Sequence, residues 1–252
     1  MNPETIPEGR VYRDLAYLFE LLTPREDYAE EAAHWRSLLR EKLGPGRQKI
    51  LELGVGAGHN LSYLTGDFEA TAADVSEEML KLCKKVNPGV ELHTGDMRHI
   101  RLKKKFDAVL IHDAIVYMRS EDDLSAAFAT AAAHLKPGGI FITGPDYYLD
   151  KFAGPRVEHF TRANASLELT YVEYAHDPDP SDTTMETILF YMVREKGQLR
   201  IEHDRHITGL FPRATWIKLM EKAGFRVEPR ILTSEGVPHE LLVGTLSEKT
   251  GQ

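Results

Sequence analysis

The stretch that decides the fold covers residues 49–64 and reads KILELGVGAGHNLSYL. It begins with a short apolar run typical of a strand and then passes through three glycines, Gly54, Gly56 and Gly58. From Asn60 onward the pattern predicts a helix. Glycine lets the backbone approach a ligand closely and adopt φ values closed to other residues, and the free N–H groups at a helix start face whatever binds there. The stretch therefore predicts a ligand site built from a strand, a turn and a helix.

The glycines are not spaced as in a dinucleotide fingerprint, because the third glycine of G-x-G-x-x-G would fall where this chain has His59. Glu52 instead stands two residues before the first glycine, and a carboxylate there can bind an ammonium group rather than a pyrophosphate. Asp74 follows at the expected exposed end of a second strand, where an acid suits a ribose diol because it accepts two hydroxyl hydrogen bonds. His59 therefore disfavours a nicotinamide oxidoreductase, and the two acids indicate a ligand with an amino group and a ribose.

The composition is typical of one large globular domain, with 252 residues of which 42% are hydrophobic and 28% charged. The net charge of −8 argues against nucleic acid as a partner. The first ten residues lack the apolar region of a signal peptide, and no apolar run approaches the roughly 18 residues that span a bilayer, so we expect a cytoplasmic protein without membrane contact. The single cysteine, Cys83, excludes an internal disulfide, and because no typical metal-binding spacing occurs we predict no metal.

Strand and helix patterns alternate through the middle of the chain, which predicts an α/β fold with a parallel sheet. After Pro145 the pattern changes to two-residue alternation, and about residues 166–208 predict an inserted antiparallel meander of three strands. We expect a single domain with four parts. These are a helical cap at 1–45, a ligand-binding core at 46–145, a substrate-side insertion at 146–208 and a return to the core sheet at 209–247.

Two features accompany the glycine turn and Asp74: Asp96 follows a third strand, and the segment LKPGG at 135–139 joins a helix to a fifth strand. With the glycines they make the chain resemble the class I S-adenosylmethionine-dependent methyltransferases. The resemblance implies a Rossmann-like seven-stranded sheet of order 3-2-1-4-5-7-6 and S-adenosylmethionine as the cofactor. It also implies that Glu52 lies near the amino-acid end of the cofactor, Asp74 near its ribose and Asp96 near its adenine.

The same resemblance implies the remaining cofactor contacts. Met97 would pack on the adenine ring, although a methionine there also suits simple core packing. Tyr17 lies in a segment, residues 11–42, that the apolar pattern predicts to be helical. In this family such a segment commonly covers the cofactor, so Tyr17 is the candidate for a contact with the methionine end, and half-buried packing is the alternative. The expected cofactor contacts are Tyr17, Glu52, Gly54, Gly56, Gly58, Asp74, Val75, Met79, Asp96, Met97 and His112.

A narrower resemblance rests on DYAEEA at 27–32, LHTGDMRHIRLKKKFDAV at 92–109, and RHITGLFPRATW with KAGFRVE within 205–228. These segments are similar to the sugar-amine N-methyltransferases, which implies in-line methyl transfer to a small-molecule amine of a sugar or related metabolite. A small-molecule O- or carboxyl-methyltransferase and a non-catalytic cofactor-binding protein are the alternatives. The candidate catalytic residues are His112, at the end of a fourth strand, and Tyr147, after the fifth. The meander is expected to build the acceptor side, and it is also the surface through which a homodimer would form.

Overall fold

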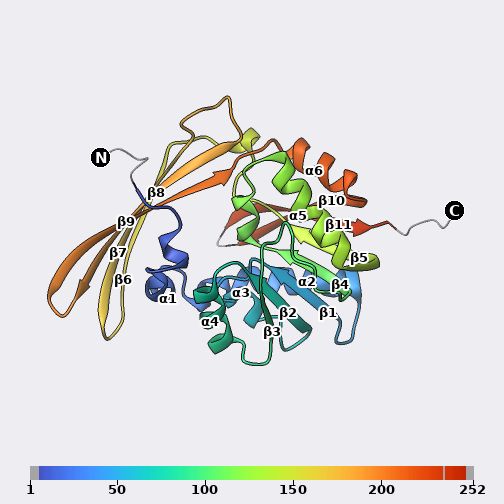
Figure 1. Ribbon diagram of the computed structural model, residues 1–252, viewed down its shortest axis with the longest axis horizontal. Helices are drawn as coiled ribbons and strands as arrows, with labels where there is room; N and C mark the ends of the chain where they lie inside the picture. Colours follow the sequence, from blue (N-terminus) through green and yellow to red (C-terminus); the bar gives the residue numbers. More distant parts are fainter. Residues whose placement is uncertain (1–5, 235, 248–252) are drawn as a thin grey trace.

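The computed structural model describes residues 6–234 and 236–247, and two β-sheets dominate it (Figure 1). The larger sheet has seven strands in the order β10-β11-β5-β4-β1-β2-β3. Numbered along the chain within this sheet, the order is 3-2-1-4-5-7-6, which confirms the predicted Rossmann-like architecture. Its strands are β1 (Lys49–Leu53), β2 (Glu69–Asp74), β3 (Glu91–Thr94), β4 (Phe106–Ile111), β5 (Leu135–Thr143), β10 (Phe225–Ser234) and β11 (Val237–Leu246).

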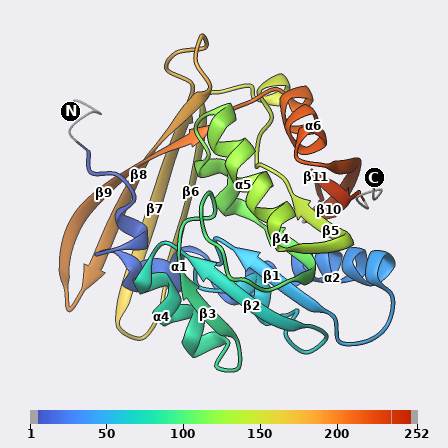
Figure 2. The ribbon, with the colours of Figure 1, turned by 45° about the vertical axis from the view of Figure 1, so that its right-hand side comes forward.

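Helices cover both faces of this sheet, as the apolar central strands require. The alternation along β1 sends Leu51 into the hydrophobic cluster on one face and Ile50 into the cluster on the other. Trp216 of α6 belongs to the first cluster, where α5 and α6 lie side by side (Figure 2), and Trp35 of α2 belongs to the second. The helices are α1 (Phe19–Leu22), α2 (Ala29–Leu43), α3 (His59–Ser62), α4 (Glu77–Val86), α5 (Glu121–His134) and α6 (Arg213–Lys222). Within the described residues, no helix has the length and apolar character needed to cross a membrane.

The N-terminal segment differs from the helices predicted over residues 11–42. Before α2 it consists of short 3-10 turns and the single turn α1, with η2 at Arg10–Tyr12 and η3 at Ala16–Leu18. Its leucines, including Leu15, pack against the second sheet instead of the core sheet. Because these tertiary contacts decide the local conformation, the apolar stripe does not extend into one continuous helix.

The inserted sheet has four strands, so the prediction of a three-stranded meander is wrong by one strand. The strands β6 (Arg156–Ala163), β7 (Leu167–His176), β8 (Thr184–Glu195) and β9 (Gln198–Gly209) follow one another in an antiparallel meander. The additional strand is β6, an edge strand whose residues are almost all exposed. Because β6 contributes only the partly buried Phe160 to a hydrophobic cluster, its sequence lacks the two-residue apolar alternation that revealed its neighbours.

The N-terminal cap is hydrogen-bonded to the inserted sheet and to α3, the helix that follows β1 of the core sheet. The backbone N–H of Val11 donates to the Asp204 carboxylate of β9 at 2.8 Å, and the Arg10 guanidinium contacts Glu202 of the same strand at 2.9 Å. On the other side, the His59 ring at the start of α3 lies 2.8 Å from the carbonyl oxygen of Thr23. The cap therefore closes the space between the core sheet and the inserted sheet.

Candidate functional site

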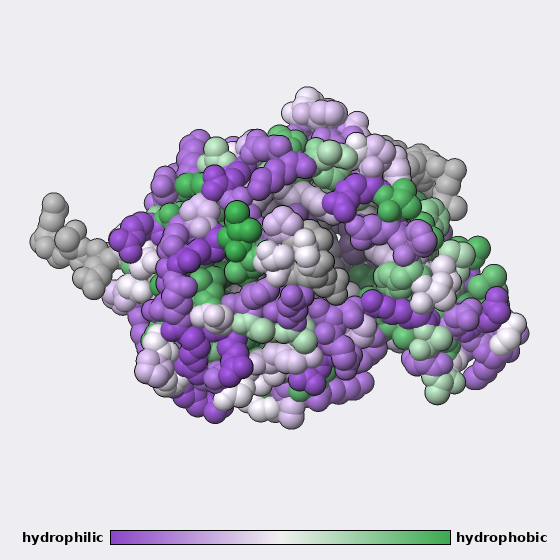
Figure 3. All heavy atoms as spheres, turned by 180° about the vertical axis from the view of Figure 1, so that it is seen from behind, coloured by the Kyte–Doolittle hydropathy of each residue, from purple (hydrophilic) through white to green (hydrophobic). Residues whose placement is uncertain are grey.

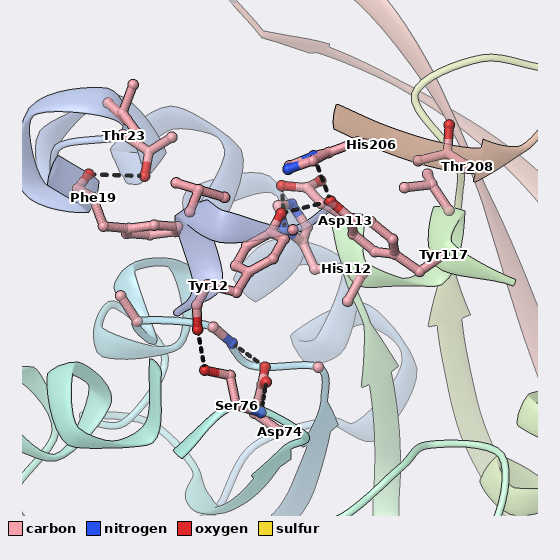
Figure 4. Close-up of a pocket in the computed structure, with 18 of the residues that line it drawn as sticks. Tyr12, Phe19, Thr23, Asp74, Ser76, His112, Asp113, Tyr117, His206 and Thr208 are labelled. Carbon is pink, nitrogen blue, oxygen red and sulfur yellow. Dashed lines mark hydrogen bonds and ion pairs between the residues drawn. The ribbon is translucent and has the colours of Figure 1, made fainter. Parts of the chain in front are cut away.

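A cavity of about 940 Å³ lies at the carboxyl ends of the core strands, beneath the cap and beside the inserted sheet (Figure 4). Open α/β sheets bind ligands at this edge. The volume is near the upper end of the range for small-molecule sites, about 300–1,000 Å³. Such a cavity has room for a cofactor and a second small molecule.

The glycine turn forms one wall of the cavity. Gly54 and Gly58 have φ values of +75° and +72°, which residues with a side chain rarely adopt. A Cβ atom on Gly54 would lie 2.3 Å from the Cβ atom of Ala114, so the turn also has no room for one. Gly56, with φ of +54°, has no atom within 4 Å of its Cβ position and exposes its backbone to the cavity. Positive φ values favour glycine at all three positions, and Gly56 leaves open space in which a ligand could approach the backbone.

Asp74 is fixed by the backbone of that wall. Its two carboxylate oxygens accept hydrogen bonds from the N–H groups of Gly56 and Ser76, each at 2.8 Å. The side chain is 7% exposed, so the prediction of an exposed strand end is wrong, and burial raises the pKa of Asp74. Each oxygen keeps a lone pair, because a carboxylate oxygen can accept two hydrogen bonds. The geometry therefore leaves Asp74 able to accept from a ribose diol.

Glu52 is a buried carboxylate on the wall of the cavity. It is 2% exposed, and its Oε2 atom has no hydrogen-bond partner among the described residues. Burial raises the pKa of Glu52 to about 7, although the nearby His112 lowers it. A buried carboxylate of this kind costs free energy unless a cation pairs with it. The ammonium group of S-adenosylmethionine fits this requirement.

Asp96 and Met97 line the cavity after β3. The Arg98 guanidinium pairs with Asp96 at 2.6 Å and with Asp123 at 2.7 Å, and this pairing lowers the pKa of the Asp96 carboxyl group. Asp96 is therefore held ionised and oriented, while Met97 is 8% exposed and packs in the hydrophobic cluster. Val75 also lines the cavity, with 65% of its side chain exposed.

Two predicted cofactor contacts lie outside the cavity. Tyr17 is 47% exposed, and its ring centre lies 5.6 Å from the guanidinium carbon of Arg200 on the inserted sheet. Met79 is buried within α4, where its backbone N–H donates to the capping hydroxyl of Ser76. Both assignments are corrected. The short turns of the cap present Tyr12 to the cavity instead of Tyr17, and Met79 is packed in the interior.

His112 has a carboxylate on each ring nitrogen. Its Nε2 atom lies 2.6 Å from an oxygen of Glu31 on α2, and its Nδ1 atom lies 3.1 Å from an oxygen of Asp113. Burial alone would lower the pKa of His112, but the two carboxylates outweigh it and raise the pKa well above the usual value. Each ring nitrogen already has a carboxylate partner, so the structure gives His112 a positioning role, and its predicted catalytic role stays a prediction. The ring packs edge-on to Trp35, 5.1 Å between centres, and ties the cap to the core.

The part of the cavity between β5 and the inserted sheet is acidic. Tyr147, the other candidate catalytic residue, lines it half-buried, with the guanidinium carbon of Arg156 5.0 Å from its ring centre. Asp146 is exposed to the cavity, and the surrounding protein together with the neighbouring Asp113 raises the pKa of Asp146 to about 7. Burial raises the pKa of Glu173. Seven further residues line the cavity that were not predicted from the sequence. They are Tyr12, Asp113, Tyr117, Asp146, Glu158, Glu173 and His206.

Some of these residues carried a sequence signal and others did not. Asp113 and Asp146 follow β4 and β5, and the carboxyl ends of adjacent parallel strands meet at one edge of a sheet. Glu158 and Glu173 instead face each other across β6 and β7, a register that no local pattern specifies.

A glycine turn beside two buried acids, Glu52 and Asp74, on a Rossmann-like sheet is typical of α/β proteins that bind a nucleoside cofactor. A family model described as a methyltransferase domain matches residues 50–139. The chain is 32% identical to the dTDP-3-amino-3,4,6-trideoxy-alpha-D-glucopyranose N,N-dimethyltransferase of Streptomyces venezuelae over 206 residues, covering 81% of this chain and 85% of that protein. It is 27% identical to the dTDP-3-amino-3,6-dideoxy-alpha-D-glucopyranose N,N-dimethyltransferase of Streptomyces fradiae, covering 88% of each.

Solved structures agree with these sequence relatives. The crystal structure of Streptomyces venezuelae DesVI superposes with a TM-score of 0.81 at 28% identity, covering 93% of this chain and 98% of that one. The sugar N-methyltransferase KedS8 from Streptoalloteichus superposes with a TM-score of 0.80 at 25% identity, covering 93% and 92%. The chain belongs to the S-adenosylmethionine-dependent methyltransferase family. It is an enzyme whose cofactor, when bound, supplies a methyl group activated by a sulfonium.

Proposed function

We propose that the acceptor of the methyl group is a small-molecule amine, carried by a sugar or a related metabolite. The observation that carries this proposal is the acidic part of the cavity, where Asp113, Asp146 and Glu173 face a space large enough for a second molecule. Carboxylates there attract an ammonium group and repel a carboxylate acceptor. The names of the relatives, which are sugar-amine dimethyltransferases, support the same substrate class.

The cofactor roles that we propose follow the geometry. Glu52 pairs with the ammonium group of S-adenosylmethionine, Asp74 accepts from the ribose hydroxyls, and Asp96 binds the adenine amino group. Met97 and Val75 contribute apolar contacts, and the glycine turn provides the close backbone approach. The core at 46–145 with the cap at 1–45 would then hold the cofactor, while the insertion at 146–208 and the return at 209–247 complete the acceptor side and the sheet.

The residues of the acceptor side position the amine and exclude water. Tyr147 and Tyr12 provide aromatic walls, and the cap closes the cavity from above. Methyl transfer is an in-line displacement, for which correct orientation alone contributes on the order of 7–11 kcal/mol. The amine must offer a lone pair, so its ammonium form has to lose a proton before transfer.

The test is a homocysteine-release assay on a matched pair of acceptors. The first is dTDP-3-amino-3,6-dideoxy-α-D-glucose, and the second is the same molecule with a hydroxyl in place of the amino group. We expect turnover of the amine and none of the alcohol. Turnover of the alcohol alone would support O-methylation, and binding of S-adenosylhomocysteine without turnover across a panel of amino sugars would support a non-catalytic binding protein.

We also propose a homodimer formed through the inserted sheet, and a cytoplasmic location. The inserted sheet exposes Val157, Leu199 and Ile201, each about 60% accessible, and hydrophobic residues are visible on that side of the molecule from behind (Figure 3). Unpaired apolar surface of this kind favours association. Light scattering should give twice the monomer mass of 28.5 kDa, and Leu199→Asp with Ile201→Asp should reduce it to the monomer mass. A dimer that survives both substitutions would place the interface elsewhere. Cell fractionation tests the proposed cytoplasmic location.

A further inference from the structure

A chain of four polar side chains links the cap to the inserted sheet, and three of them, Tyr12, Tyr117 and His206, line the cavity (Figure 4). The Tyr12 hydroxyl lies 2.7 Å from the Tyr117 hydroxyl, which lies 2.8 Å from Nδ1 of His206. Nε2 of His206 lies 3.2 Å from an oxygen of Asp204. Tyr117 ends η5 (Asp113–Tyr117), and the other partners come from the cap and β9, so three separate elements assemble the chain.

The buried end of this chain fixes the direction of its hydrogen bonds. Asp204 is fully buried and already accepts from the backbone N–H groups of Val11 and Arg205, each at 2.8 Å. Burial alone would raise the pKa of Asp204, but His206 and the backbone N–H groups of Arg10 and Val11 lower it, so the group stays a carboxylate. A carboxylate only accepts, and therefore Nε2 of His206 donates.

In a neutral imidazole the other ring nitrogen is then an acceptor. Nδ1 of His206 consequently accepts from the Tyr117 hydroxyl, and the Tyr117 oxygen accepts from Tyr12. Burial raises the pKa values of Tyr12 and Tyr117, so both stay protonated phenols that pass on a proton only when they receive one. The free lone pair at the end of the chain belongs to Tyr12, whose side chain lines the cavity.

We propose that Tyr12, Tyr117 and His206 form a proton relay that removes a proton from the ammonium form of the acceptor. The acceptor N–H gives its proton to the Tyr12 oxygen as Tyr12 gives its own to Tyr117 and Tyr117 gives its own to Nδ1 of His206. The net result is the transfer of one proton from the ammonium group to His206. Both tyrosines are regenerated as phenols, and the amine nitrogen now has a free lone pair for methyl transfer. Tyr12 is the catalytic residue that touches the acceptor, and Asp204 positions His206 and stabilises its imidazolium. The relay rests on the proposed function, because only an amine acceptor brings such a proton.

Four titratable groups face His206. They are Tyr12 from the cap, which stacks on the ring with 5.5 Å between centres, Tyr117 from η5, Asp204 on its own strand, and Glu173 from β7. The two carboxylates are the charged members of this set. With 12% of its side chain exposed, the imidazolium can pass the proton on to water.

The first test is the pH dependence of kcat/KM for Tyr117→Phe, measured with dTDP-3-amino-3,6-dideoxy-α-D-glucose. The substitution removes one hydroxyl and keeps the ring. At pH 7 we expect kcat/KM to fall by about a hundredfold, which is in the range of general acid–base catalysis. Above the pKa of the substrate ammonium group the amine arrives neutral, so the loss in kcat/KM should shrink to about threefold. A deficit that stays constant with pH would mean a structural role and would overturn the relay. Tyr63→Phe is the control, since its hydroxyl donates to the Arg25 carbonyl outside the cavity and its loss should leave the profile unchanged.

The second test needs no turnover. Nitrogen-15 NMR of histidine-labelled protein, assigned with His206→Asn, reports which ring nitrogen carries the proton. We expect the Nε2–H tautomer for neutral His206, with a change at Nδ1 in Tyr117→Phe but not in Tyr63→Phe. The Nδ1–H tautomer would overturn the relay even if the amine is methylated. Should wild type fail to methylate every amino sugar, the proposed acceptor class would fail, and the relay with it.

Discussion

Replacing Glu52 by glutamine should weaken the cofactor complex and stabilise the free protein at the same time. The buried carboxylate has an oxygen without a partner among the described residues, and burial raises its pKa from 4.5 to about 7. At about 1.4 kcal/mol for each pH unit, this difference destabilises the folded free protein by roughly 3 kcal/mol once Glu52 ionises. Glutamine has nearly the same shape and carries no charge, so it removes this cost.

The same change removes the partner of the cofactor ammonium group. A hydrogen bond to a charged group contributes about 1.5–3 kcal/mol, so the affinity for S-adenosylhomocysteine should fall by about ten- to 150-fold. Calorimetry measures this affinity, and urea unfolding of the free protein measures the stability. The sign of the pH dependence follows from the raised pKa. The folded state holds the Glu52 proton more tightly than the unfolded state, so this contribution to stability is lost as the pH rises from 4.5 to about 7. In Glu52→Gln this loss should be absent.

The matched control is Glu221→Gln, at an exposed position on α6. It should leave the affinity unchanged and the stability within about 0.5 kcal/mol of wild type. The reasoning would be refuted if Glu52→Gln bound S-adenosylhomocysteine as tightly as wild type, or if the free variant were less stable than wild type at pH 8.

Three further predictions concern other walls of the cavity. Asp74→Ala should lower the affinity for S-adenosylhomocysteine about ten- to hundredfold in calorimetry, and unchanged affinity would exclude the ribose contact. It should also lower the free energy of unfolding by about 1–3 kcal/mol, because the N–H groups of Gly56 and Ser76 lose their acceptor. Gly54→Ala should abolish cofactor binding and reduce the melting temperature, since its Cβ would lie 2.3 Å from another Cβ at a φ of +75°; wild-type affinity would show that the turn tolerates a side chain. Asp146→Asn should raise KM for an amino sugar about tenfold above pH 7, where the carboxylate is charged, and have little effect at pH 6, because its pKa is about 7; an equal effect at both pH values would show that the charge is not responsible.

The cofactor side of the site could largely be predicted from the sequence. Glu52, the glycines and Asp74 lie within or next to short strands, and the spacing along a strand fixes which end of the sheet each residue reaches. Tyr17 was wrongly placed because the part of the cap before α2 is built of 3-10 turns and a single α turn. With 3.0 instead of 3.6 residues per turn, a different tyrosine faces the ligand.

The acceptor side could not be predicted in the same way. Glu173 and His206 belong to antiparallel strands, where only the pairing register and the packing of the cap decide which face meets the cavity. The edge strand β6 is mostly exposed and leaves no periodic signal. His112 carried a positional signal, but the carboxylate that occupies its second nitrogen comes from Glu31, 81 residues earlier in the chain.

The most direct test of the central claim is to locate the transferred methyl group. The enzyme is incubated with S-adenosylmethionine labelled with carbon-13 in the methyl group and with dTDP-3-amino-3,6-dideoxy-α-D-glucose labelled with nitrogen-15. We predict a product whose methyl carbon couples to the nitrogen in the NMR spectrum, as an N-methyl group requires. A methyl signal without nitrogen coupling, at the chemical shift of an O-methyl group, would contradict the assignment of this protein as an amine methyltransferase.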